Sequence, residues 1–214
     1  MKKIISLILI ISSLFVFAAC DDSGDRTYNE QEVIAAAKNL IRKSEEYNDI
    51  FWGEGIRYVE DDNYSSGIYY PADPIHLNEL GFKKVSDITD GMKKVYSEKY
   101  SKQITDSVFS SKVGNTNMAG FVRYYQDNDL FMVYSEYTPL LVDEVEYLYD
   151  TVKVLGSDGA LVNIEITVKI TKASNDEAEE AKIQERSIKI SLIEEEGGWR
   201  IDSPTYARYR EDLN

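Results

Sequence analysis

Few residues in this chain could perform chemistry on a substrate. The 214 residues include one histidine, His76, and one cysteine, Cys20. A single histidine excludes every site that needs two imidazoles, and a single cysteine excludes an intrachain disulfide and any cysteine-rich metal site. A general base needs an orienting partner and a place in a pocket. His76 follows Pro74 outside any catalytic motif, and we interpret it as a surface or loop residue.

Carboxylates are abundant, but their spacing does not match a metal site. The stretches at residues 61–63 (Asp-Asp-Asn) and 127–129 (Asp-Asn-Asp) lack the glycine and closing glutamate of a calcium loop. We interpret both as turns. The sequence also lacks a Gly-x-Ser-x-Gly nucleophile motif and a phosphate-binding glycine loop. We therefore expect no bound metal and no cofactor.

One carboxylate supports an alternative in which the protein has a ligand-binding or catalytic pocket. Asp150 is in phase with Leu148, Val152 and Val154 along a predicted strand, so its side chain is expected on the buried face. A buried carboxylate has a raised pKa unless it is paired, and beside a tyrosine hydroxyl it would suit an isomerase or a dehydratase. Other interpretations place Asp150 near a strand bulge or in a pair with an arginine.

Tyrosine is the most unusual component, with sixteen residues. Two adjacent pairs, Tyr69-Tyr70 and Tyr124-Tyr125, would each present one ring outward if they lie in strands. One interpretation is ordinary sheet packing, which tyrosine favours. The other is a partner surface, because tyrosine offers a large amphipathic contact area with few rotatable bonds. With Asp73, these four tyrosines form our candidate binding surface.

Charge limits the class of partner. The chain has 38 acidic and 24 basic residues and a formal net charge of −14. A field of this sign repels phosphate backbones, so we exclude nucleic acid as a partner. The acidic stretch at residues 175–181 is interpreted as a solvated connection.

The first nineteen residues are predicted to be a signal peptide. Lys2 and Lys3 precede a nearly continuous apolar run over residues 4–17, which ends in Ala18-Ala19-Cys20. This order of charge, short apolar core and small residues is typical of a secretory signal. At about 1.5 Å per residue the run is short for a membrane span, although a thin N-terminal anchor is the alternative.

The position of Cys20 resembles the lipobox of bacterial lipoproteins, with Phe17 where that family usually has leucine. The resemblance implies that Cys20 is lipidated, that residues 20–28 form a tether and that the protein is extracytoplasmic and anchored to the membrane by lipid. A free thiol is the alternative. Two acyl chains give stable anchoring that one chain does not. If the envelope has two membranes, Asp21 favours the inner one.

The pattern predicts helices first and strands afterwards. Apolar residues at three- and four-residue steps predict a helix over residues 30–51, started by Asn29 with Glu32 and ended by Gly53 and Gly55. A second helix is predicted over residues 86–100 with Ser86 as its cap, and a short third over residues 102–111. Residues 56–73 are predicted as one or two short strands or an ordered loop.

Strands dominate the second half. Hairpins are predicted over residues 121–136 and 147–171, followed by strands near residues 188–192 and 199–201. The strict alternation from Val162 to Ile170 predicts one buried and one solvated face. We therefore expect one α+β domain over residues 29–214, with N-terminal helices packed on a curved antiparallel sheet that encloses a cone.

Two resemblances refine this expectation. The final hairpin with Gly198-Trp199-Arg200-Ile201 resembles the end of NTF2-like (cystatin-like) domains of bacterial lipoproteins, a fold that serves enzymes, ligand binders and interaction modules alike. The segment Tyr69-Tyr70-Pro71-Ala72-Asp73, followed by a predicted helix, resembles the secreted inhibitor family of cell-wall DL-endopeptidases. This second resemblance implies a protein that occludes an NlpC/P60-type peptidase.

Together these observations predict a cell-surface lipoprotein that acts as a non-catalytic binding module, either inhibiting or docking onto a cell-wall peptidase. The alternative is a protein with a small-molecule pocket inside the cone, either a ligand binder or an enzyme that uses Asp150.

Overall fold

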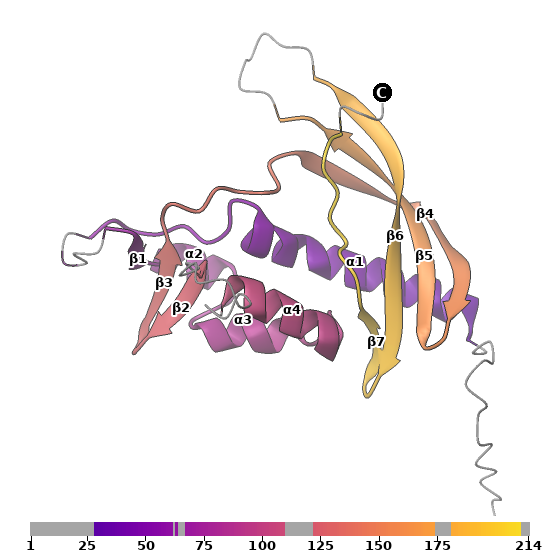
Figure 1. Ribbon diagram of the computed structural model, residues 1–214, viewed down its shortest axis with the longest axis horizontal. Helices are drawn as coiled ribbons and strands as arrows, with labels where there is room; N and C mark the ends of the chain where they lie inside the picture. Colours follow the sequence, from indigo (N-terminus) through magenta and orange to yellow (C-terminus); the bar gives the residue numbers. More distant parts are fainter. Residues whose placement is uncertain (1–27, 62, 64–66, 110–121, 174–180, 211–214) are drawn as a thin grey trace, which may run out of the picture.

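The computed structural model describes residues 28–61, 63, 67–109, 122–173 and 181–210 (Figure 1). Within these residues, four helices and two antiparallel sheets form an α+β structure, which confirms the predicted fold class. The signal segment 1–19, Cys20, the tether except its last residue and nearly all of the acidic stretch 175–181 lie outside the described residues. Lipidation of Cys20 therefore stays a prediction.

Among the helices that the structure describes, none combines the length and the apolar character needed to cross a membrane.

The long first helix, α1 (Glu30–Trp52), confirms the helix predicted from the apolar repeat. The Asn29 side chain accepts hydrogen bonds from the backbone of Gln31 and Glu32, so it caps the helix start. Gly53 follows the last turn, and its backbone N–H donates to Asp49 O at 2.9 Å. Local sequence is therefore enough to determine both ends of α1.

Three shorter helices follow: α2 (Pro74–Glu79), α3 (Val85–Met92) and α4 (Glu98–Val108). The prediction of one helix over residues 86–100 is wrong, because the chain leaves the helix after Met92 to contact the last strand. There Ser97 N donates to Ile201 O at 2.8 Å and Ile201 N donates to Val95 O at 2.9 Å. The predicted short third helix corresponds to α4, which begins four residues earlier.

The caps of α3 and α4 differ from the predicted cap at Ser86. The Asp87 carboxylate accepts the backbone N–H groups of Lys83 and Lys84 at the start of α3, which lowers the pKa of Asp87. Ser97 caps α4, since its hydroxyl accepts from Tyr100 N at 3.0 Å. Asp87 can satisfy two backbone donors at once, whereas Ser86 lies one residue inside the helix.

The smaller sheet has the order β1-β3-β2, with β1 (Tyr69–Pro71), β2 (Tyr124–Asp127) and β3 (Leu130–Tyr134). β2 and β3 confirm the predicted hairpin, and Asn128 between them adopts a positive φ of 51°. Outside β1, Tyr58 forms an antiparallel bridge with Ala72, so the described part of the region 56–73 supplies one short strand and one bridge.

The larger sheet has the order β4-β5-β6-β7, with β4 (Glu144–Asp158), β5 (Leu161–Thr171), β6 (Ile183–Glu195) and β7 (Gly198–Ile201). The alternation predicted along β5 is confirmed, because its inward residues are fully buried. The sequence predicts a single curved sheet, but the described strands divide into two sheets that share no strand pairing.

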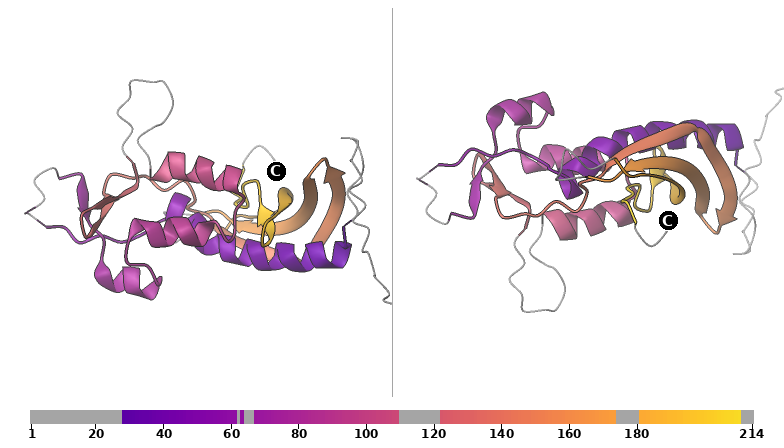
Figure 2. Two further views of the ribbon diagram at one scale, coloured as in Figure 1. Left: turned by 90° about the horizontal axis from the view of Figure 1, so that it is seen from below. Right: turned by 90° about the horizontal axis from the view of Figure 1, so that it is seen from above.

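The two sheets lie at opposite ends of the described structure and α1 extends between them (Figure 1). The first half of α1 lies along the inside of the larger sheet, whose strands curve around it (Figure 2). The second half of α1 lies beside α3 and α4. The inside of the curved sheet is therefore filled by the apolar side of α1, including Val33, Ala37 and Ile41, none of which is exposed.

Candidate functional site

The three-stranded sheet divides the candidate tyrosines between its two faces. Directly paired residues share a face in an antiparallel sheet, and Tyr69 pairs with Tyr134 while Tyr125 pairs with Met132. Tyr69, Tyr125 and Tyr134 therefore lie on one face. With Pro71 and Met132, they make up what we call the tyrosine face.

The three rings of the tyrosine face are in contact. The ring centroids of Tyr69 and Tyr125 are 4.9 Å apart with the rings nearly perpendicular, at 83°. Tyr69 and Tyr134 have centroids 5.3 Å apart at an angle of 42°. Each of the three tyrosines is half-buried, whereas Met132 is buried. Edge-to-face contacts of this kind hold the rings in a defined arrangement, so the face presents a preformed aromatic surface.

Burial raises the pKa of Tyr69 and of Tyr134, so both hydroxyls stay protonated at neutral pH. Tyr69 donates its hydroxyl to Val122 O at 2.7 Å, and Tyr134 donates to the Glu136 carboxylate at 3.2 Å. Burial, with the neighbouring Tyr125 and Tyr134, raises the pKa of Tyr69 to about 12. A tyrosine that acts as a base at neutral pH needs the opposite shift. The arrangement therefore suits contact and hydrogen bonding and does not suit proton abstraction.

The opposite face of the same sheet holds Tyr70 and Tyr124, which correct the predicted surface. Tyr124 is fully buried; its hydroxyl accepts from Ile56 N at 3.0 Å and donates to Ile50 O at 2.8 Å. Tyr70 stacks on Tyr58 with centroids 5.4 Å apart and an angle of 12°. Tyr124 is therefore a core residue that closes the end of α1, and the prediction that it belongs to a contact surface is wrong.

Asp73 has a local structural role. Its carboxylate accepts from Ile75 N at 2.9 Å and caps α2, whose first residue is Pro74. An aspartate cap followed by proline is a favourable way to begin a helix. Its neighbour Ala72 is buried and donates its backbone N–H to Phe131 O at 2.8 Å. The Tyr-Tyr-Pro-Ala-Asp segment is thus explained as a strand end joined to a helix start.

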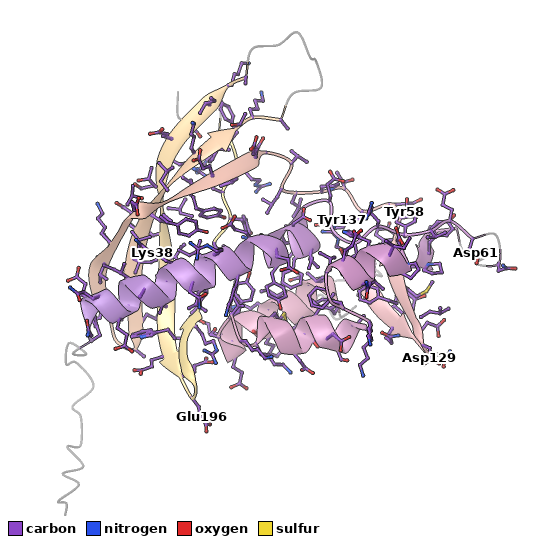
Figure 3. All side chains as sticks on the ribbon, turned by 180° about the vertical axis from the view of Figure 1, so that it is seen from behind. Lys38, Tyr58, Asp61, Asp129, Tyr137 and Glu196 are labelled. Atoms are coloured by element: carbon purple, nitrogen blue, oxygen red, sulfur yellow. The ribbon has the colours of Figure 1, made fainter. Side chains whose placement is uncertain are left out.

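Arg123 connects the tyrosine sheet to α1. Its side chain is buried, and Nη2 donates to Gly53 O at 2.7 Å and to Glu54 O at 2.9 Å, just beyond the last turn of α1. The guanidinium lies 3.8 Å from the ring centroid of Tyr137, which Figure 3 shows near that end of the helix. This cation complements the negative end of the helix dipole and holds the sheet against it.

Asp150 does not point toward the core. The ladder between β4 and β5 shifts register between Leu148 and Lys153, and this bulge turns the intervening side chains. The Asp150 side chain is fully exposed, with Lys38 Nζ at 3.8 Å as its ionic partner. The predicted burial is therefore wrong, because strict alternation fails across a bulge. The pocket alternative loses the buried carboxylate on which it depended.

The remaining sequence candidates have unremarkable surroundings. His76 lies in α2, where its Nδ1 accepts from Arg57 N at 3.0 Å. Asp61 and Asp129 lie at the outer end of the molecule (Figure 3), and Asp61 accepts from Asn63 N at 2.9 Å, as in a turn. Within the described ranges, no group of three or more histidine, cysteine or acidic side chains is placed to hold a metal ion.

Apart from the tyrosine face, the structure has a groove along the C-terminal segment, residues 206–210. An open groove of about 650 Å³ is lined by this segment, by Leu140, Val142 and Asp143, and by Arg186 of β6. A smaller pocket of about 230 Å³ lies on the other side of Tyr206, between α1 and the start of β4. Sequence reasoning missed both features, because each is formed by segments that lie far apart in the chain.

Sequence reasoning also missed Tyr134 and Arg123. Tyr134 lies near the end of a predicted strand, but only the register with β1 brings it to Tyr69. Arg123 had no distinguishing signal, because its partners are carbonyls 70 and 69 residues away.

Comparison of the chain with protein-family models, with curated proteins and with solved structures finds no match.

Proposed function

We propose that the protein is a non-catalytic binding module of the bacterial cell envelope and that it contacts a protein partner through the tyrosine face. The observation that carries this proposal is the preformed cluster of Tyr69, Tyr125 and Tyr134 on one side of the small sheet. Tyrosine is enriched at protein interfaces, since it combines contact area with a polar tip at low entropic cost.

The surroundings of the tyrosine face indicate the charge of the partner. Glu136 accepts from Tyr134, and Asp127 and Asp129 are exposed at the hairpin beside Tyr125. The face is therefore aromatic at its centre and acidic at its rim. A partner with a basic rim fits this pattern, and the rate at which such a partner associates should fall as salt is added.

The partner class to test first is an NlpC/P60-type cell-wall peptidase. This choice rests on the resemblance of the Tyr-Tyr-Pro-Ala-Asp segment, which includes two members of the tyrosine face, Tyr69 and Pro71. Lipid attachment at Cys20 with a short tether would hold the domain close to the membrane. In this arrangement the protein would meet enzymes that act on newly inserted wall.

The experiment uses the fragment 21–214 as bait in a pull-down from envelope extract, read out by mass spectrometry. The test variant combines Tyr125→Thr and Tyr134→Thr, because threonine keeps strand propensity and removes the ring. The matched control is Tyr149→Thr, a half-buried tyrosine on the larger sheet. We expect the same partner with the wild type and the control, and its loss with the double variant.

Two results separate the general proposal from its sharper form. A partner retained by the double variant would contradict the assignment of the tyrosine face. A purified NlpC/P60-type peptidase that stays fully active in a large molar excess of the fragment would contradict inhibition while leaving the pull-down result to decide the binding role.

The pocket alternative has less support. The concave side of the larger sheet is occupied by α1, and the Asp150 side chain is fully exposed to solvent. The measurement that separates the two classes is Asp150→Asn, which would abolish a turnover reaction at this residue and leave binding through the tyrosine face unchanged.

A further inference from the structure

The groove beside the C-terminal segment has the dimensions of a ligand site. Its volume of about 650 Å³ falls within the range of roughly 300–1,000 Å³ typical of small-molecule sites. It lies on the larger sheet and its neighbouring segments, and it shares no residue with the tyrosine face. Any role of this groove is therefore independent of the function proposed above.

The described lining of the groove is rich in arginine, although the chain as a whole is acidic. Its lining includes three arginines, Arg186, Arg208 and Arg210, and one carboxylate, Asp143. Among these lining residues the arginines outnumber the carboxylates three to one, whereas the whole chain has 24 basic and 38 acidic residues. Arginine presents a planar fork of donors that matches a carboxylate in two-point contacts. The groove is thus suited to an anion.

The backbone that carries two of these arginines is held in place. Gln184 is buried; its Nε2 donates to Arg210 O at 3.0 Å, and its Oε1 accepts from Arg210 N at 3.3 Å. Asp143 accepts from Tyr209 N at 2.8 Å and from Ala173 N at 3.1 Å. These contacts fix the segment against the larger sheet. A fixed wall lowers the ordering cost of binding.

The groove also has an apolar side. Leu140 and Val142 are 50% and 57% exposed, among the most exposed large apolar residues of the described chain, and both line the groove. Tyr206 adds an aromatic ring to the same lining. A site with arginines on one part and exposed apolar side chains on another favours a ligand that carries both carboxylates and an apolar side chain.

We propose that this groove binds a short acidic peptide, with carboxylates on Arg208 and Arg210 and an apolar side chain against Leu140 and Val142. Nucleic acid is a poor alternative, because the negative field of the whole chain repels an extended polyanion. Inorganic phosphate would use the arginines alone and leave the apolar residues exposed to water.

The test measures binding by isothermal titration calorimetry with the full-length chain in a non-ionic detergent. The probe is an acetylated tetrapeptide with one leucine and three glutamates. Two comparison peptides replace either the glutamates by glutamine or the leucine by serine. We expect the acidic peptide to bind more tightly than both, and its affinity to fall as sodium chloride is raised from 50 to 300 mM.

Two double variants are compared, and each of them removes two positive charges. Arg208→Gln with Arg210→Gln removes two exposed cations from the groove, and Arg57→Gln with Lys102→Gln removes two exposed cations elsewhere. We expect the first pair to weaken binding of the acidic peptide about tenfold or more, because charge-assisted hydrogen bonds are lost. The control pair should change the affinity less than twofold.

Three results would overturn the proposal. They are no heat of binding at millimolar acidic peptide, equal affinity for the glutamate and glutamine peptides, and equal weakening by the groove and control pairs. Equal affinity for the leucine and serine peptides would remove the apolar half of the proposed contact and reassign the groove to anions in general, with inorganic phosphate as the competing probe. Tyr125→Thr with Tyr134→Thr should leave peptide binding unchanged.

Discussion

Replacing Arg123 by methionine tests how the small sheet is attached to α1. The change keeps an unbranched side chain and removes two charged hydrogen bonds, to Gly53 O and Glu54 O. A hydrogen bond to a charged group contributes about 1.5–3 kcal/mol. The cation–π contact with Tyr137 adds about 1–2 kcal/mol. Desolvation of the guanidinium offsets part of this sum, because burying a charge is costly. We expect a net loss of about 3 kcal/mol.

Urea denaturation followed by tyrosine and tryptophan fluorescence measures this loss. With a slope of about 2 kcal/mol per molar urea, the midpoint of Arg123→Met should lie about 1.5 M below that of the wild type. The matched control is Arg57→Met, which breaks the exposed ion pair with Glu79 at 3.1 Å. Exposed pairs contribute about 0–1 kcal/mol, so the control midpoint should move by less than about 0.5 M.

Arg123→Lys refines the interpretation. Lysine keeps the positive charge but has a shorter side chain and lacks the planar guanidinium that lies over the Tyr137 ring. Its midpoint should therefore fall between those of the wild type and Arg123→Met. A midpoint for Arg123→Met within about 0.3 M of wild type, or equal losses for Arg123→Met and Arg57→Met, would refute the reasoning.

Three other predictions concern stability. Gly55→Ala should cost about 2 kcal/mol or more, because φ is +73° and the new methyl would overlap Arg123 and Tyr124, whereas Gly159→Ala, at φ +57° in open space, should cost only about 1 kcal/mol. Both losses can be read from urea midpoints. Asp150→Asn should change the melting temperature by less than about 2 °C, since its side chain is exposed; a large loss would contradict the bulge. Burial raises the pKa of Tyr124 to about 12, above the value of about 10 in an unfolded chain. The unfolded chain therefore loses this proton first, so the free energy of unfolding should stay level up to about pH 9 and fall above pH 10 by up to about 1.4 kcal/mol per pH unit for each such tyrosine. Urea titrations from pH 7 to 11 would show this, and a stability that rises above pH 10 would contradict it.

The Tyr-Tyr-Pro-Ala-Asp segment shows why a short resemblance needs structural context. Four of its five residues have roles within the fold: Tyr70 stacks on Tyr58, Pro71 pairs with Met132, Ala72 is buried and Asp73 caps α2. Tyr69 contributes the aromatic ring of this segment to the tyrosine face, next to Pro71. The proposed partner contact therefore depends more on Tyr125 and Tyr134 than on the Tyr-Tyr-Pro-Ala-Asp segment.

The elements that the sequence predicted well are those governed by local periodicity. α1 has a continuous apolar repeat, a cap at Asn29 and a glycine at its end, so neighbouring residues alone determine it. β5 alternates strictly from Val162 to Ile170, and the structure buries those inward residues completely. In both cases each side chain has the same environment as the residue one period away.

Tertiary structure decided the features that depend on residues far apart in the chain. The helix over residues 86–100 divides because Ser97 and Val95 bond to Ile201 instead. Asp150 turns outward because β4 must change register against β5. The tyrosine face exists because β1 and β2 both pair with β3. The groove beside the C-terminal segment is lined by residues from three separate segments. Local pattern determines which side of an element is apolar, but register and packing between elements determine which polar and aromatic side chains meet.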